Sequence, residues 1–231
     1  WETEQEKNRQ MSALAHDIKT PLTVVRGNSE LLLETELTDE QKNYADYISG
    51  SVLQIQNYVQ TLIEVTKSQE GISQAPVNVN VYDVLADIKK QTLGLSEVYQ
   101  HQINWKEELE SENSDSVISV VYDHVVRAVM NVVRNAVEHT PKGSVINITV
   151  TYSDGELAFT VEDSGSGFTP EGLAHGTEQF FMDDSSRTGG SHYGIGLFFA
   201  KKVAEEHGGK IVLANSNETS GAKVEISFTS Q

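Results

Sequence analysis

Apolar side chains recur at helical spacing in the first part of the sequence, in two stretches at roughly 1–35 and 39–69. The second stretch carries a seam of coiled-coil type, with steps of four and three: Ile48, Val52, Ile55, Val59 and Leu62. The first carries one apolar stripe: Met11, Leu14, Ile18, Leu22 and Val25. Between them, Thr38 or Asp39 is a candidate N-cap. A two-helix hairpin cannot bury both stripes alone, so the pattern predicts a homodimer in which two hairpins form a four-helix bundle.

This periodicity stops in the segment SQEGISQAPVN (residues 68–78), where glycine, serine and proline interrupt it. Beyond this segment the pattern changes to shorter strands and helices. We therefore expect a helical hairpin over 1–70, a linker over 71–77 and a second domain over 78–231.

The second domain alternates between strand and helix patterns. Its expected elements are a strand at 77–81, a helix near 82–95, strands near 102–109 and 117–120, a helix at about 122–139, a helix near 195–207, and strands at 210–216 and 222–229. The segment VINITVTYSDGELAFTVED adds two alternating strands joined by Asp154-Gly155, a strong hairpin signal. A Gly-rich stretch occupies 164–194. These elements predict an α+β domain with a helical layer on one largely antiparallel sheet.

Acidic residues outnumber basic ones by 34 to 17, which gives a formal net charge of −17. This balance argues against a broad nucleic-acid surface and against a patch for anionic membranes. The sequence has no cysteine, so disulfides, zinc–thiolate sites and thiol catalysis are excluded. No apolar run approaches the ~20 residues that span a bilayer, and no signal peptide opens the sequence. The first residues, WETEQEKNRQ, read as a helix already under way, so we expect a piece of a longer chain.

Four polar residues fall at steps of four in the expected helix 122–139: Arg127, Asn131, Asn135 and His139. They therefore share one helix face. A solvated polar face is the simpler interpretation. Two asparagines one turn apart in a Val-rich helix still need a reason, because asparagine is only a middling helix former. Amide oxygens are hard ligands suited to Mg²⁺, which commonly arrives with substrate phosphates.

The segment EDSGSGF places Asp163 at the end of a strand, followed by Gly165 and Gly167. Glycines at this spacing allow positive φ and a close approach of the backbone to a flat ligand. A carboxylate at this point can accept a hydrogen bond from an exocyclic amine. A simple Gly/Ser turn is the competing interpretation.

The segment HYGIGLFFAKKV places Gly194 and Gly196 where a loop enters a helix. The N–H groups and the dipole at such a helix start favour phosphate. The segment is not a Rossmann fingerprint, because Phe199 stands where the third glycine is needed. No Walker motif occurs in the sequence either.

The segment LAHDIKTPLTVV, residues 14–25, places His16, Asp17 and Pro21 inside an expected helix. A helix built only for packing has no use for an interior proline, since Pro21 cannot donate to the carbonyl of Asp17 and bends the helix. A core histidine beside a chance proline is the alternative. The segments later in the sequence argue against that alternative.

Taken in order, these segments resemble the boxes of the sensor histidine kinases. NVVRNAVEHT, VEDSGSGF and GIGLFFAKKVAEEHGGKI resemble the N, G1 and G2 boxes of their ATP-binding domain. FFMDDSSR resembles the F box, and AHDIKTPLT resembles the H box. The resemblance covers essentially the whole sequence. It implies a helical hairpin that forms a dimeric four-helix bundle, followed by an α+β ATP-binding sandwich of the Bergerat type.

The resemblance also implies roles for individual residues. His16 is the phosphoacceptor, Asp17 is the general base that orients it, and Thr20 orients water in a phosphatase reaction. Asn135 is the implied Mg²⁺ ligand and Asp163 the acid that reads adenine. The implied nucleotide-binding positions are Asn131, Asn135, His139, Asp163, Gly165, Gly167, Gly194, Gly196 and Leu197.

The sequence departs from the family pattern in three places. Glu138 stands where lysine is common, and Met182 stands where the F box usually has a basic residue. His192 and Tyr193 open the G2 box in place of its usual first residues. Arg187 is then the nearest cation of the F box and the implied catalytic one. These departures concern nucleotide affinity and the lid rather than the phosphoacceptor.

By this resemblance, the sequence predicts an ATP-dependent protein-histidine kinase with Mg²⁺ as cofactor. It autophosphorylates His16, passes the phosphate to an aspartate of a response regulator, and acts as a phosphatase toward that partner. We expect a homodimer, no nucleic-acid partner, and the cytoplasmic portion of a membrane-anchored bacterial sensor. A non-catalytic ATP-binding scaffold is the alternative; gyrase- and chaperone-type ATPases lack the H-box hairpin. Whether each ATP-binding domain serves its own His16 or its partner's stays open.

Overall fold

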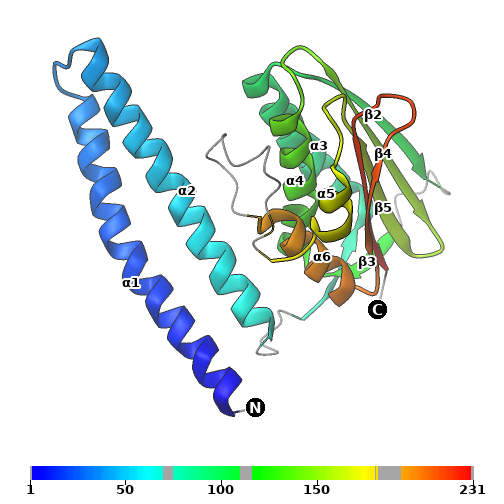
Figure 1. Cartoon of the computed structure of the whole chain (residues 1–231). Helices are drawn as coiled ribbons and strands as arrows, with labels where there is room; N and C mark the ends of the chain where they lie inside the picture. The colour runs from blue at the N-terminus through cyan, green and yellow to red at the C-terminus, as the bar shows by residue number, and fades with distance from the viewer. Residues whose placement is uncertain (1, 70–74, 110–115, 180, 182–193, 230–231) are drawn as a thin grey trace. The chain divides into compact units, whose positions relative to one another are not determined.

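The computed structural model describes residues 2–69, 75–109, 116–179, 181 and 194–229 (Figure 1). Two compact units divide the chain, Trp1–Ser73 and Gln74–Gln231. None of the described helices combines the length and the apolar character that a membrane span requires.

The first unit is a hairpin of two long helices, α1 (Glu2–Leu33) and α2 (Asp39–Gln69) (Figure 1). These bounds agree with the predicted stretches. A reciprocal capping box starts α2. The Gln41 N–H donates to Thr38 Oγ1 at 3.3 Å, and the Thr38 N–H donates to Gln41 Oε1 at 3.0 Å. Of the two candidate N-caps, Thr38 is therefore the one used.

A polar contact joins the two helices of the hairpin. Ser29 is buried, and its Oγ donates to the carbonyl oxygen of Ala45 at 2.8 Å. The hydroxyl of Ser49 donates to Ser29 Oγ at 3.0 Å. Because a buried hydroxyl needs partners at one particular place, this contact fixes how α1 and α2 align.

The predicted apolar stripes are only partly buried within one hairpin. Val52 and Val59 are buried, whereas Val25 and Ile48 are exposed. The side chains of Met11, Leu14 and Leu62 lie outside the described residues. Among the side chains of the hairpin that the structure describes, the large apolar ones that are exposed are Val24, Val25, Leu31, Leu32, Tyr44, Tyr47 and Ile48.

The second unit is built on a five-stranded sheet with the order β2-β4-β5-β7-β6. The strands are β2 (Gln102–Leu109), β4 (Val145–Ser153), β5 (Glu156–Glu162), β6 (Ile211–Asn215) and β7 (Ala222–Thr229). β2 runs parallel to β4, and the other neighbours are antiparallel. The predicted hairpin turn is confirmed, with φ of 50° at Asp154 and 78° at Gly155. The largely antiparallel sheet is confirmed as well.

Two expected strands lie outside this sheet. β1 (Val77–Asn80) and β3 (Val117–Val120) pair with each other, antiparallel, in a separate two-stranded sheet. The prediction of a single sheet is therefore wrong for these two strands. Each is four residues long; α3 begins directly after β1, and Val121 alone separates β3 from α4.

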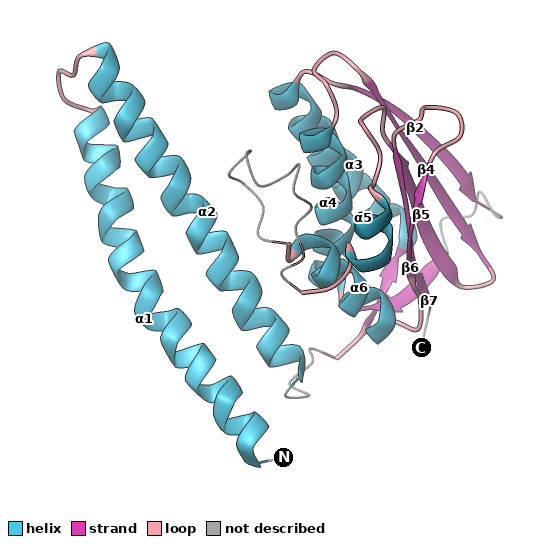
Figure 2. Ribbon diagram, in the orientation of Figure 1, coloured by secondary structure: helices cyan, strands magenta, loops and turns pink. Residues whose placement is uncertain are grey.

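A layer of helices covers one face of the sheet: α3 (Val81–Tyr99), α4 (Tyr122–His139) and α6 (Gly196–Glu206) (Figure 2). The residues of the central strands that face this layer are fully buried, among them Ile148, Phe159 and Ile226. The alternation of buried and half-buried residues along β4 and β5 is the period-two pattern of a sheet with one covered face.

Two helical segments differ from the expectation. α3 continues to Tyr99 and ends at Gln100, which has φ of 61°. A short helix, α5 (Pro170–His175), lies inside the Gly-rich stretch 164–194, where no helix is expected. The sequence does carry a signal for its start: Thr169 is the N-cap and accepts the Gly172 N–H at 2.9 Å, and proline follows as the first helical residue.

Candidate functional site

Asp163 follows β5 and is almost wholly buried, with 3% of its surface exposed. Its Oδ1 accepts the backbone N–H of Gly165 at 2.8 Å and that of Ala222 at 3.0 Å. The Asp163 N–H donates to the Ala222 carbonyl oxygen at 2.9 Å. The loop after β5 and the start of β7 thus each contribute one donor to this carboxylate. Both donors engage the same oxygen, so Oδ2 can accept a hydrogen bond from a ligand.

Burial raises the pKa of the Asp163 carboxyl above the usual aspartate value. The backbone hydrogen bonds from Gly165 and Ala222 and the nearby His139 act in the opposite direction. Burial is the largest of these effects, because the charged form has lost its hydration. A hydrogen-bond donor brought by a ligand would replace that hydration, and a perturbed carboxyl of this kind is typical of a binding site.

The glycines after Asp163 allow two close approaches. A Cβ at Gly165 would lie 2.5 Å from the His139 carbonyl oxygen, so the loop packs directly against the end of α4. Gly167 has φ of +73°, and a Cβ there would lie 2.8 Å from Asn215 Oδ1. The Asn215 amide also clamps Phe168, accepting its N–H at 2.7 Å and donating to its carbonyl oxygen at 2.9 Å. A plain surface turn needs none of these contacts.

The polar face of α4 meets the start of α6. Asn131 and Asn135 are half-buried, one turn apart. A Cβ built at Gly196 would lie 3.8 Å from the Cβ and Cγ of Asn131, an ordinary van der Waals distance, so the start of α6 lies beside that amide. One turn earlier, the Arg127 guanidinium lies 4.7 Å from the centre of the Phe199 ring. The predicted face is therefore half-buried from Arg127 to Asn135, with Arg127 and Asn131 against α6, whereas His139 at its end is exposed.

The Arg127 side chain is itself partly withdrawn from water. Burial, and next the positive charge of Arg134, lower the pKa of Arg127 from its usual value. A cation with reduced hydration next to a second cation favours a negatively charged ligand close by.

The start of α6 has the features of an anion site. Gly194 has φ of +64°, and Ile195 precedes the helix with no side-chain cap on its first N–H groups. The first intrahelical bond runs from the Phe199 N–H to the Ile195 carbonyl at 2.8 Å. The N–H groups before Phe199, those of Gly196 and Leu197 included, therefore have no partner within the helix and can bind phosphate oxygens.

The Glu138 carboxylate contacts the end of α3. The hydroxyl of Tyr99, at the end of α3, donates to Glu138 Oε1 at 3.1 Å. Burial and the Glu138 charge raise the pKa of Tyr99, which keeps this hydroxyl protonated as a donor. The carboxylate is thus engaged with α3, whereas the neighbouring His139 is exposed.

The candidate phosphoacceptor segment lies within α1. The helix continues through Pro21, and the hydroxyl of Thr23 donates to the Lys19 carbonyl oxygen at 2.9 Å. Asp17 and Thr20 are exposed on this helix. The side chain of His16 lies outside the described residues.

Comparisons with known proteins identify both units. Residues 6–71 match the family model of the His Kinase A (phospho-acceptor) domain, and residues 120–231 match that of the histidine kinase-, DNA gyrase B- and HSP90-like ATPases. The sensor histidine kinase SpaK of Bacillus subtilis is 33% identical over 226 residues, which are 98% of this chain and 48% of the relative. The chain belongs to the sensor histidine kinases.

A second sensor histidine kinase relative is the nisin biosynthesis sensor protein NisK of Lactococcus lactis subsp. lactis. It is 31% identical over 218 residues, which are 93% of this chain and 47% of the relative. The chain therefore spans about half the length of these curated relatives.

Two solved histidine kinase structures share the fold. Full-length ShkA in complex with AMPPNP has a TM-score of 0.72 at 22% identity, covering 96% of this chain and 46% of that chain. The nucleotide-free catalytic domain of ThkA has a TM-score of 0.56 at 19% identity, covering 68% of this chain and 98% of that chain. The hairpin and the sandwich are thus the architecture of this family.

Four of the singled-out residues fall in the segment 182–193, outside the described residues: Met182, Arg187, His192 and Tyr193. What they contribute stays a prediction from the sequence. Over the described ranges, no group of three or more His, Cys, Asp or Glu residues could hold a metal ion.

Sequence reasoning does not identify the residues of the β6–β7 hairpin that support the site. Thr219, Gly221 and Ala222 contact Asp163, and Asn215 holds the loop after it at Phe168. The segment NETSGAKVE carries a clear turn signal, but a turn signal does not say what the turn contacts. That follows only from the pairing of β5 with β7, in which Glu162 lies opposite Lys223.

Proposed function

We propose that this chain is the kinase core of a two-component sensor. It transfers the γ-phosphoryl group of ATP to His16 and then to an aspartate of a response regulator. The observation that carries the proposal is the Asp163 carboxylate, which is buried and fixed through Oδ1 by two backbone N–H groups. A fixed acceptor of this kind suits the exocyclic amine of adenine. The hairpin over 1–70 supplies the phosphoacceptor, and the domain over 78–231 binds the nucleotide.

In the nucleotide site, each element has a distinct task. Asp163 accepts the adenine amine through Oδ2, while Gly165 and Gly167 let the loop lie close to the base. The start of α6, with Gly194, Gly196 and Leu197, directs backbone N–H groups at the phosphates. His139, exposed at the end of α4, borders the nucleotide, and Arg187 supplies positive charge near the transferred phosphoryl group.

Asn131 and Asn135 fit a magnesium site. Their amides are oxygen donors one turn apart on a half-buried face, and Mg²⁺ prefers such donors when it arrives with phosphates. We assign Asn135 as the principal ligand and Asn131 as its neighbour. When bound, Mg²⁺ neutralises charge on the phosphates, which matters in a chain of net charge −17 that must take up an anionic nucleotide.

Phosphoryl transfer begins when a nitrogen of the His16 imidazole attacks the γ-phosphorus. The bond from that phosphorus to the β–γ bridging oxygen breaks, and ADP leaves. Asp17, the next residue on α1, accepts the N–H of the other ring nitrogen, which fixes the tautomer. Thr20 lies one turn beyond His16. In the phosphatase reaction, it orients the water that removes the phosphate from the response regulator.

The hairpin is proposed to work as a homodimer. Its exposed apolar side chains need a partner surface, and a second copy of the same hairpin supplies one in a four-helix bundle. The relatives are sensor proteins, so we place this chain in the cytoplasmic part of a membrane-anchored bacterial sensor.

The test incubates the purified chain with Mg²⁺ and γ-labelled ATP. We expect acid-labile, alkali-stable label in the parent chain and none in His16→Gln. His175→Gln is the matched control, because His175 is an exposed histidine in the other unit, and it should label normally. Robust ATP binding without label in the parent chain would overturn the kinase function and favour the scaffold alternative.

A further inference from the structure

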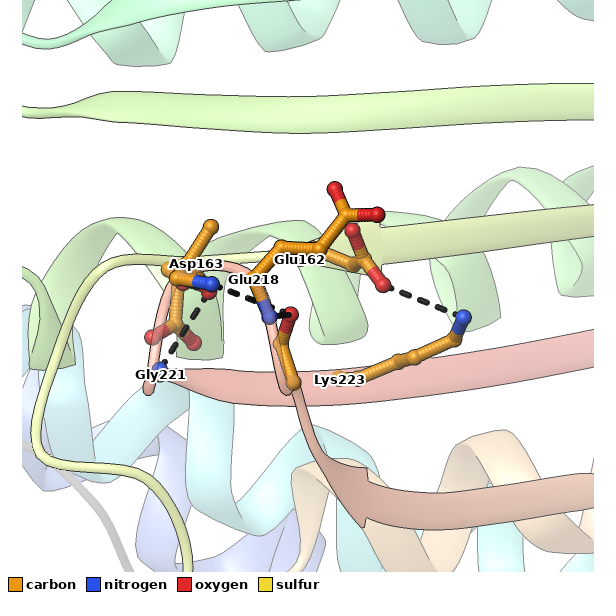
Figure 3. Close-up of polar contacts among 7 residues, drawn as sticks. Glu162, Asp163, Glu218, Gly221 and Lys223 are labelled. Atoms are coloured by element: carbon orange, nitrogen blue, oxygen red, sulfur yellow. Dashed lines mark hydrogen bonds and ion pairs between the residues drawn. The ribbon is translucent and has the colours of Figure 1, made fainter.

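The turn between β6 and β7, residues 216–221, contacts the backbone of Asp163. The Thr219 hydroxyl donates to the Asp163 carbonyl oxygen at 2.6 Å. The Gly221 N–H donates to the same hydroxyl at 3.2 Å, which orients it. Figure 3 shows Asp163 next to this turn, with the Lys223–Glu162 ion pair farther along the two strands.

The turn is braced from within. Ser216 is buried, and its Oγ accepts the N–H groups of Glu218 at 3.2 Å and Thr219 at 3.3 Å. The Ser216 N–H donates to the Gly221 carbonyl oxygen at 2.8 Å, which closes the turn. The Thr219 hydroxyl is therefore presented from a fixed support rather than from a loose loop.

The contact leaves no spare room. A Cβ at Gly221 would overlap the Asp163 carbonyl oxygen and would lie 2.6 Å from Asp163 Oδ1. The turn thus packs against both ends of this residue, its carbonyl group and its carboxylate. A shift of the turn moves the carboxylate as well.

We propose that Thr219 is a positioning residue for base recognition: its hydroxyl fixes the backbone of Asp163 and thereby the direction of the carboxylate that reads adenine. This rests on the proposed function only in assigning the base to Asp163. The N–H, the carbonyl oxygen and Oδ1 of Asp163 are each tied to the β6–β7 hairpin, by Ala222 and by Thr219. Removal of the Thr219 hydroxyl releases one of these ties and leaves a buried carbonyl oxygen without its donor.

The test compares the binding of ATP and inosine triphosphate, which lacks the exocyclic amine, to the whole chain by calorimetry. Thr219→Val removes the hydroxyl at nearly constant shape. It should lower the preference for ATP over inosine triphosphate by about five- to tenfold, as expected for one lost hydrogen bond. Thr219→Ser keeps the hydroxyl and should retain the parent preference. Should the valine methyl prevent folding, Thr219→Ala removes the hydroxyl without filling its place.

Thr149→Val is the matched control. Thr149 lies on β4 between the buried residues Ile148 and Val150 and so points to the opposite face of the sheet. The Thr149→Val variant should prefer ATP over inosine triphosphate to the same extent as the parent chain. A merely structural role for Thr219 would weaken the binding of both nucleotides alike. An unchanged ratio of the two affinities in Thr219→Val or Thr219→Ala therefore overturns the inference. A loss of preference in Thr219→Ser overturns it too.

The two proposals fail separately. A parent chain that prefers ATP and loses this preference in Thr219→Val, but never labels on His16, supports the positioning role and overturns the kinase function. If the parent chain labels normally on His16, and the parent and Thr219→Val have the same preference for ATP over inosine triphosphate, only the positioning role is overturned. Equal affinity of the parent chain for ATP and inosine triphosphate would overturn the role of Asp163 in reading the base, and with it the positioning role of Thr219.

Discussion

The helical hairpin and the ATP-binding domain bury their apolar side chains to very different extents. In the domain, the inward side chains of the central strands are completely buried. In the hairpin, Leu31 is 62% exposed and Tyr47 is 73% exposed. The domain has a closed core of its own, whereas the hairpin leaves several large apolar side chains exposed. Periodicity alone does not separate the two cases, because both units show regular apolar spacing.

The two proposed activities, nucleotide binding and phosphoryl acceptance, therefore lie in units that differ in how far they bury their apolar side chains. The proposed nucleotide site depends on Asp163 and its supports, which lie within the closed domain. The proposed phosphoacceptor lies on the helix pair, for which we propose a second copy as partner. Nucleotide binding should therefore survive changes that disrupt the dimer, and the dimer should survive changes that abolish nucleotide binding.

The largest expected effect follows from Asp163→Asn. The variant keeps an oxygen for the N–H groups of Gly165 and Ala222, but it presents an amide N–H₂ to the adenine amine. A hydrogen bond to a charged group contributes about 1.5–3 kcal/mol, so ATP affinity should fall by roughly ten- to a hundredfold. Calorimetry measures the affinity, and sedimentation checks that the dimer is unchanged. Normal ATP binding by this variant would contradict the assignment of the base to Asp163.

The pH dependence of stability controls for damage to the fold. The pKa of Asp163 is raised in the folded chain, so the unfolded chain ionises first as pH rises. Below the pKa of the unfolded chain, about 3.9, Asp163 is protonated in both states and its titration does not affect stability. As pH rises from there through the raised folded pKa, the free energy of unfolding falls. Relative to the parent chain, Asp163→Asn should therefore gain stability between acidic and neutral pH. A variant that is less stable than its parent at neutral pH would instead indicate structural damage.

An intermediate effect is expected for Leu31→Lys. Leu31 is exposed in the single hairpin, so the substitution costs the isolated helix pair little, but it places a charge in the proposed dimer interface. Burial of a leucine side chain contributes about 1.5–3 kcal/mol, so the dimer dissociation constant should rise by about tenfold or more.

Leu93→Lys is the control for this substitution. Leu93 is also an exposed helical leucine, but it lies on α3 in the ATP-binding domain. Sedimentation should show a parent-like dimer for Leu93→Lys and a weakened one for Leu31→Lys. Equal behaviour of the two variants would show that the exposed surface of the hairpin is not the dimer interface.

The same comparison explains what could be predicted from the sequence. The bounds of α1 and α2 followed from helical periodicity and from the Thr38 cap, both of which act over a few residues. The Asp154-Gly155 turn followed from the positive φ that such a turn requires. Strand partners did not follow in the same way: β1 and β3 pair with each other, and no local signal distinguishes them from strands of the main sheet.

The candidate site shows the same division. Asp163, Asn135 and Gly196 stood out because an acid, an amide or a glycine at that spacing needs a chemical reason. Thr219 did not stand out, because a threonine in a turn is ordinary, and its partner lies 56 positions earlier in the chain. Supports of this kind depend on which strands are neighbours, and that is decided by the packing of the whole sheet.

The smallest effect tests whether the two units unfold independently. Ser29→Ala removes the buried hydroxyl that donates to the Ala45 carbonyl and accepts from Ser49. The loss of such a contact should lower the free energy of unfolding of the hairpin by about 1 kcal/mol. In a calorimetric scan, only the hairpin transition should move. Ser51→Ala removes an exposed serine of α2 and should move neither transition. If Ser29→Ala shifted both transitions together, the hairpin and the ATP-binding domain would unfold as a single cooperative unit. The contrast between a domain with its own core and a separate hairpin would then not hold.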